Sequence, residues 1–169
     1  MYFAHLAGPA GRVFSYEFAP GNLEIFSRNL NLNPGLKDRI NIVERAAWSN
    51  SNFRLHFEDD GPSTRMVAEN GNLDVAVETL SIDDLVETKA IAHVDFIKMD
   101  IEGSELQALR GAIKTIKRDQ PEMAICIYHK IMDFVEIPEF ILSLNVGYRL
   151  FIRHYTIYEE ETVLYAKVK

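Results

Sequence analysis

The sequence predicts an α/β fold with a doubly wound sheet, and three observations support this prediction. Apolar segments of strand length alternate with segments whose apolar residues recur at helical spacing. The run 123–129, MAICIYH, is almost entirely apolar, which is typical of a strand buried on both faces. Residues 94–106, VDFIKMDIEGSEL, indicate a strand that ends at a carboxylate, turns at glycine and enters a helix. Open α/β sheets bind their ligands at such strand ends.

The first part of the chain contains two predicted strands with a helix between them. Residues 1–8 have the composition of the last turns of a helix, and a turn follows them. Residues 13–17 form the first predicted strand. Pro20 favours a helix start, and the helix carries an apolar face until Asn-Pro-Gly at 33–35 ends it. Residues 40–43 are the next strand.

The middle of the chain predicts two strands and a short helix. Apolar residues alternate over 53–57, as in a half-buried strand, and the turn 59–62 follows. Residues 61–73 have the composition of a loop. Alternation over 75–79 indicates a second strand, and Ser81 is expected to cap a helix that begins with two aspartates.

The last part of the chain predicts two further helices and a terminal pair of strands. Ser104 and Gln107 fit a capping box, so we expect one helix from Ser104 with apolar residues to Ile116. We expect a second helix at 134–144, with its inward side chains at Phe134, Ile137, Ile141 and Leu144. Residues 147–152 and 162–166 are expected to form an antiparallel pair.

Composition excludes several classes of protein. The chain of 169 residues is long enough for one domain, and its net charge of −7 disfavours binding to nucleic acid or to an anionic membrane. No apolar stretch approaches the roughly 20 residues that a membrane span needs. The single cysteine excludes a disulfide framework. Residues 1–9 do not have the basic leader of a signal peptide, so we expect a cytoplasmic protein with a small-molecule substrate and an undetermined oligomeric state.

Several segments together resemble the FkbM family of S-adenosylmethionine-dependent methyltransferases. They are VFSYEFAPGNLEIFSRNLNLN, INIVERAAWSN, ETLSIDDL, VDFIKMDIEGSELQALRGA, PEMAICIYHK and GYRLFIRHY, in this order. The resemblance covers about residues 11–166, and DIEGSELQALRGA is its most specific part. It implies a Rossmann-like methyltransferase sheet with a reversed final strand, S-adenosylmethionine as cofactor, and O-methylation of a hydroxyl on a sugar or other small metabolite.

The sequence departs from the family in one respect. Family members begin the domain with a strand and a glycine-rich turn, roughly Asp-x-Gly-x-x-x-Gly, that wraps the methionine part of the donor. The 169 residues contain no such motif. We therefore expect a single methyltransferase-like domain over residues 1–169 that is N-terminally truncated and lacks its first strand. A truncated, non-catalytic domain that has lost donor binding is the alternative function.

The resemblance implies four residues for donor binding. Glu17 ends a strand where the family's acidic residue bonds the ribose hydroxyls, and a carboxylate accepts such charge-assisted bonds well. A solvated glutamate at a strand end is the alternative. Ala46, Ala47 and Trp48 resemble the segment that flanks the adenine, where small residues permit close approach and the indole covers a ring. Trp48 as an ordinary packing residue is the alternative.

Two residues are candidates for catalysis. Asp100 would lie beside the transferred methyl group, or it would only cap the turn that follows its strand. His129 ends the other buried strand and has a pKa suited to a general base, or it is a structural histidine. Asp100 with Glu102 suggests a carboxylate-metal hydrolase as a weaker reading, but two carboxylates do not make a selective site, so we predict no metal.

Overall fold

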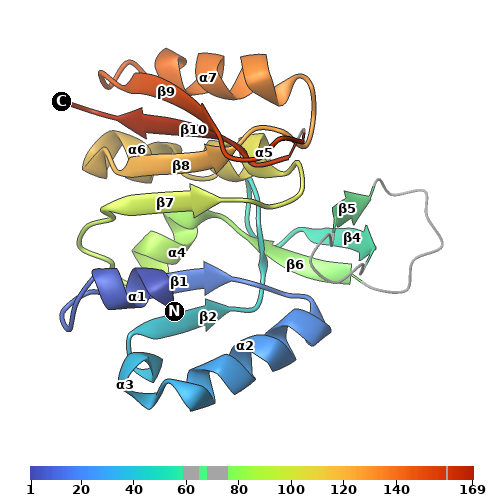
Figure 1. The fold of residues 1–169 in the computed structure, drawn as a ribbon, viewed down its shortest axis with the longest axis vertical. Coiled ribbons are helices and arrows are strands. Elements are labelled where there is room, and N and C mark those ends of the chain that lie inside the picture. Colours follow the sequence, from blue (N-terminus) through green and yellow to red (C-terminus); the bar gives the residue numbers. More distant parts are fainter. Residues whose placement is uncertain (59–64, 68–75, 159) are drawn as a thin grey trace. The chain divides into compact units, whose positions relative to one another are not determined.

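The computed structural model describes residues 1–58, 65–67, 76–158 and 160–169 (Figure 1). The chain divides into two compact units. Unit 1 comprises Met1–Ala46 and Arg54–Glu78, and unit 2 comprises Ala47–Phe53 and Thr79–Lys169. The predicted turn at 59–62 and most of the predicted loop at 61–73 lie outside the described residues. No helix in the described part of the chain is both long and apolar enough to cross a membrane.

The N-terminal part of unit 1 is a parallel strand pair with helices packed against it. Its elements are α1 (Tyr2–Leu6), β1 (Val13–Tyr16), α2 (Pro20–Leu32), α3 (Pro34–Lys37) and β2 (Ile40–Val43). β1 pairs with β2 in parallel, with Val13 opposite Ile40. Ala4 and Leu30 are buried with Ile40. The two strands and the helix between them are therefore as predicted, and a short second helix follows the predicted stop at 33–35.

The rest of unit 1 contains antiparallel strands: β4 (Arg54–Glu58), β5 (Arg65–Val67) and β6 (Ala76–Leu80), whose last residues belong to unit 2. β3 (Ala46–Ala47) completes a sheet with the order β3-β6-β4-β5. The predicted alternation is confirmed at Phe57 and Val77, which are buried together with Ala46. It is wrong at Phe53, which precedes β4 and is 56% exposed, and Val75 lies outside the described residues. The loop prediction is wrong at residues 65–67, because these residues hydrogen-bond to β4 along its edge.

The described part of unit 2 contains a mixed sheet and four helices. Its elements are α4 (Ile82–Thr88), β7 (Phe96–Met99), α5 (Glu105–Arg110), α6 (Ile113–Asp119), β8 (Glu122–Cys126), α7 (Asp133–Ser143), β9 (Arg149–His154) and β10 (Thr162–Lys167). The strand order is β7-β8-β10-β9. β7 and β8 are parallel, and β10 is antiparallel to both β8 and β9. The predicted terminal antiparallel pair is confirmed.

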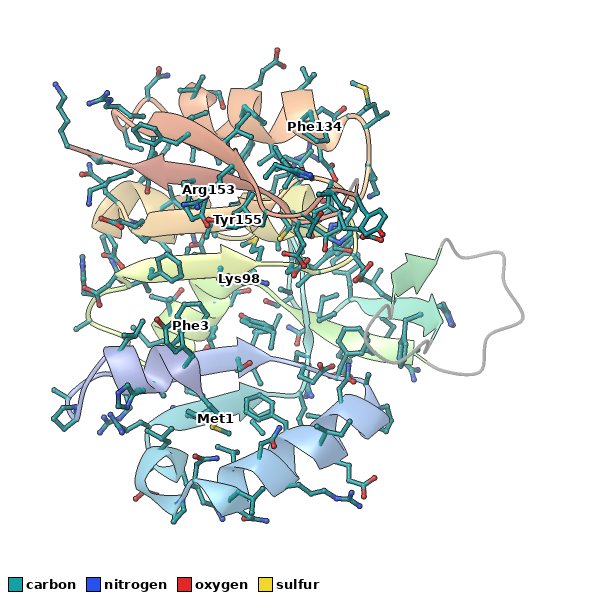
Figure 2. The ribbon with its side chains drawn as sticks, in the orientation of Figure 1. Met1, Phe3, Lys98, Phe134, Arg153 and Tyr155 are labelled. Atoms are coloured by element: carbon teal, nitrogen blue, oxygen red, sulfur yellow. The ribbon has the colours of Figure 1, made fainter. Side chains whose placement is uncertain are left out.

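One face of this sheet packs against helices α5, α6 and α7. Ile97 and Met99 of β7 lie on this face beside Met123 and Ile125 of β8. The expected inward position of Phe134, which is labelled in Figure 2, is wrong, because this residue is 40% exposed. The buried stripe of α7 runs through residues four apart, and Asp133 occupies its first position in place of Phe134.

The helix predicted after Ser104 is divided into α5 and α6 at Gly111. A Cβ atom at Gly111 would lie 2.0 Å from the carbonyl oxygen of Trp48, so the backbone approaches this segment as closely as only glycine permits. The capping box is also wrong: Ser104 occupies the N-cap position, but its side chain makes no cap hydrogen bond. The Ser81 cap is confirmed, since its Oγ accepts from Asp84 N at 3.1 Å.

Asp83 has a larger role than that of a helix-start carboxylate. Its Oδ1 accepts from Thr115 N at 2.8 Å and from Thr115 Oγ1 at 2.7 Å, and its Oδ2 accepts from Lys114 N at 3.0 Å. Lys114 N and Thr115 N belong to the first turn of α6, where backbone N–H groups have no partner within their own helix. Asp83 of α4 therefore caps α6 from another part of the chain.

Candidate functional site

The carboxyl ends of β7 and β8 bring the two predicted catalytic residues together. β7 ends at Met99, so Asp100 is the first residue beyond it, and β8 ends at Cys126, three residues before His129. Because the two strands are parallel neighbours, their carboxyl ends lie at the same edge of the sheet. Asp100 Oδ1 lies 3.5 Å from His129 Nε2.

Asp100 is an ionised carboxylate with several partners. Lys98 Nζ lies 2.9 Å from Oδ2, and the Tyr128 hydroxyl donates to Oδ1 at 3.1 Å. Burial by itself would raise the pKa of Asp100, but the hydrogen bonds and charge supplied by Lys98, together with the Cys126 thiol and Tyr128, outweigh it and lower this pKa. Because its pKa is lowered, the Asp100 carboxylate stays ionised and can accept a hydrogen bond from a hydroxyl group.

His129 lies among three carboxylates. Its Nδ1 is 3.1 Å from Glu105 Oε1, and its Nε2 is 3.6 Å from Glu102 Oε2 and close to Asp100. Burial by itself would lower the pKa of His129, but Glu105, Glu102 and Asp100 together raise it. The imidazole therefore keeps its proton to a higher pH than a free histidine, and a protonated ring donates a proton before it can accept one.

Glu105 is a candidate site residue that the sequence analysis missed. It is completely buried, although it stands in the first turn of α5. Its Oε1 accepts a hydrogen bond from Ile101 N at 2.8 Å, while its Oε2 has no hydrogen-bond partner among the described residues. A signal was present in the sequence, because Glu105 precedes Ala108, Leu109 and Ala112 at the spacing of the buried face of the helix.

The turn between β7 and α5 holds these carboxylates in a restricted conformation. Glu102 has a φ of 54° and Gly103 a φ of 83°, so two consecutive residues occupy the left-handed region. Only glycine adopts this region without steric cost. The Lys130 ammonium donates to the carbonyl oxygen of Gly103 and ties the turn to the segment after β8. Left-handed non-glycine residues occur often at binding sites.

The groups beside Asp100 are not nucleophiles. Burial raises the pKa of the Cys126 thiol to about 12, and the charge of Asp100 adds to this effect. Burial and Asp100 also raise the pKa of the Tyr128 phenol. Since a thiolate and not a thiol attacks electrophiles, Cys126 has no nucleophilic role at neutral pH.

The residues predicted for donor binding are distributed over both units. Glu17 and Ala46 belong to unit 1, whereas Ala47 and Trp48 belong to unit 2 with Asp100 and His129. Ala46 is buried, and Ala47 packs against the core of unit 2. The adenine contact of Ala46, Ala47 and Trp48 stays a prediction.

Glu17 follows β1 directly, as predicted, and caps the turn that leads into α2. Its Oε1 accepts from Phe18 N at 2.7 Å and from Ala19 N at 2.9 Å. This arrangement holds the carboxylate at the end of the strand. The ribose contact of Glu17 stays a prediction.

Comparison with known proteins identifies the family. The model of the methyltransferase FkbM domain matches residues 1–150. The chain belongs to the FkbM methyltransferase family. A crystal structure of methyltransferase FkbM from Methylobacillus flagellatus KT aligns over 98% of the chain, with a TM-score of 0.72 and 29% sequence identity. The α/β fold with mixed sheets therefore matches that of a solved FkbM methyltransferase.

A second relative has a named activity. Hexuronic acid methyltransferase AglP from Haloferax volcanii is 26% identical to the chain over 117 residues, or 68% of the chain. The chain spans 46% of the length of this protein and 40% of the length of the Methylobacillus protein. It thus corresponds to less than half of each.

Proposed function

We propose that this chain is part of an S-adenosylmethionine-dependent O-methyltransferase that acts on a hydroxyl group of a sugar or other small metabolite. The observation that carries the proposal is the pairing of Asp100 with His129 at the carboxyl ends of two parallel strands, in a chain of the FkbM family. The name of the Haloferax relative, a hexuronic acid methyltransferase, supports a sugar as acceptor.

The chemistry requires few functional groups. Methyl transfer is an in-line displacement, in which the acceptor oxygen forms a bond to the methyl carbon as the donor sulfur leaves with its electron pair. The protein mainly aligns the two reactants. The acceptor hydroxyl must also lose its proton, and the ionised Asp100 is suited to accept a hydrogen bond from it. Asp100 would take up this proton as the new bond forms, and the His129 ring lies 3.5 Å from the same carboxylate.

We also infer the type of sheet, the class of acceptor and the cellular compartment. The family and the alternation of strands and helices support a Rossmann-like, doubly wound sheet for the domain. The net charge of −7 supports a small-molecule acceptor over a nucleic acid. The single free cysteine is consistent with a reducing, cytoplasmic compartment.

A non-catalytic domain is the second candidate function, and one observation favours it. The 169 residues contain no Asp-x-Gly-x-x-x-Gly turn to receive the methionine part of the donor. Titration calorimetry with S-adenosylmethionine tests this second candidate. We expect weak or no binding by residues 1–169, because Glu17 cannot replace several hydrogen bonds of about 0.5–1.5 kcal/mol each. Micromolar binding would show that the donor site needs no such turn, and would remove the argument for this candidate.

The division of roles is tested by kinetics in a form of the protein that binds the donor. Asp100→Ala is expected to lower kcat more than it raises the KM for the donor, whereas Glu17→Ala is expected to do the reverse. Glu122→Ala is the control, since Glu122 is an exposed carboxylate at the start of β8. Equal proportional changes in both constants for both variants would contradict the assignment. Loss of folding in Asp100→Ala, with normal kinetics in the folded fraction, would show that Asp100 only caps its turn.

A further inference from the structure

Three side chains near the carboxyl end of β7 lie close together, and all three are of kinds that bind metal ions. Asp100, Glu105 and His129 each offer one donor atom, and these atoms all lie within 4.8 Å of one another. Bonds of about 2.1 Å to a common ion allow donor atoms to be up to about 4.2 Å apart, so small side-chain rotations are enough to bring the three onto one ion.

Two of these side chains are buried without complete hydrogen bonding. Glu105 is fully buried, and its Oε2 has no partner among the described residues. The His129 side chain is 9% exposed. Its nitrogens lie near carboxylates, but within the described part of the chain neither makes an aligned hydrogen bond. Buried polar atoms are nearly always paired, so unpaired atoms that meet at one place indicate a ligand.

The charges around the set also favour a cation. Asp100, Glu102 and Glu105 lie within 3.6 Å of the imidazole, and Asp133 interacts with it electrostatically. Lys98 contacts Asp100, and Lys130 contacts the carbonyl oxygen of Gly103. With His129 neutral, these groups carry a formal charge of about −2, which one divalent cation balances. With His129 protonated, one negative charge stays uncompensated.

We infer that Asp100, Glu105 and His129 bind a divalent cation of the first transition row. One imidazole nitrogen and two carboxylate oxygens suit Mn²⁺ or Zn²⁺ better than Mg²⁺, which favours oxygen ligands alone. The prediction from sequence that no metal binds here considered only Asp100 and Glu102. The structure instead places Glu105 and His129 beside Asp100, which gives three ligand side chains without Glu102.

This inference does not rest on methyl transfer, because binding is measured without donor or acceptor. The methyltransferase proposal and the cation-binding proposal assign different roles to the imidazole of His129. A His129 nitrogen that coordinates a cation cannot also accept a proton, so Asp100 and the cation would then position the acceptor hydroxyl.

The test is a titration of the full 169-residue chain with Mn²⁺, followed by the loss of the electron paramagnetic resonance signal of free Mn²⁺. Zn²⁺ and Mg²⁺ are then used as competitors. Glu105→Gln and Asp100→Asn each keep the shape of a ligand and remove its charge. Glu122→Gln removes the same charge from an exposed residue of β8 and is the matched control. Circular dichroism establishes that each variant is folded.

We expect one equivalent of Mn²⁺ to bind, with Zn²⁺ competing more strongly than Mg²⁺. Each ligand variant should weaken binding at least about tenfold, and the control should leave it unchanged. If Glu105→Gln does not fold, Asp100→Asn decides alone, since Asp100 is partly exposed. The inference is overturned by a lack of saturable binding of both Mn²⁺ and Zn²⁺, or by binding that the folded ligand variants do not weaken.

Discussion

The cap that Asp83 provides to α6 predicts a large loss of stability on substitution by alanine. The carboxylate accepts hydrogen bonds from Lys114 N, Thr115 N and the Thr115 hydroxyl. Removal of an N-terminal cap costs about 1 kcal/mol of unfolding free energy. Thr115 is 2% exposed, so its hydroxyl would lose its acceptor in the interior, which costs a further 1–3 kcal/mol or so. We expect Asp83→Ala to lower the free energy of unfolding by about 2–4 kcal/mol.

Denaturant unfolding measures this loss directly. Trp48 is the single tryptophan of the chain and belongs to unit 2, so its fluorescence reports on the unit that contains α4 and α6. Asp83→Asn keeps acceptor oxygen but not charge, and should lose about half as much. Glu87→Ala, at an exposed position of the same helix, should change stability by less than about 0.5 kcal/mol. An Asp83→Ala variant as stable as this control would refute the capping argument.

Two further substitutions test the packing of unit 2. Gly111→Ala should destabilise the chain by about 3 kcal/mol, because the added Cβ would lie 2.0 Å from the carbonyl oxygen of Trp48. Gly35→Ala is the control, since a Cβ there meets nothing within 4 Å. The unfolding of both variants is followed by circular dichroism. Asp119→Asn should lower the stability of the chain most above about pH 4. The Arg118 guanidinium and the Val94 N–H hold the pKa of Asp119 below its ordinary value of 3.8. The stabilisation by the carboxylate is therefore present above that value and is lost as the pH falls through the lowered pKa. A difference from the unsubstituted chain that does not shrink between pH 5 and pH 2, or thereabouts, would contradict this sign.

The elements that the sequence predicted best are those in which local pattern and tertiary packing agree. Four strands are short apolar segments between turn residues: β1, β2, β7 and β8. The ends of each strand differ from the predicted ends by three residues or fewer. Ser81 caps α4 through a bond within four residues of chain. Such interactions depend on neighbours in sequence, so a sequence contains the information needed to predict them.

The parts that could not be predicted depend on contacts between distant residues. Asp83 reaches α6 over more than thirty residues, and no local pattern indicates this. Gly111 interrupts a helical pattern because Trp48 lies against it. At the site, Asp100 and His129 were found from their places at strand ends. The helical spacing of Glu105 gave a signal for its burial, but its contact with His129 follows from how α5 packs on the sheet. A glutamate in a first helical turn is usually exposed.

The buried Cys126 has a practical consequence for study of this chain. As the single cysteine, with its thiol protonated well beyond neutral pH, it should react very slowly with maleimides and other thiol reagents while the chain is folded. A cysteine introduced at an exposed position, such as Ile25 of α2, would then be labelled selectively without prior removal of the native one. Fluorophores and spin labels can therefore be attached to an otherwise natural sequence.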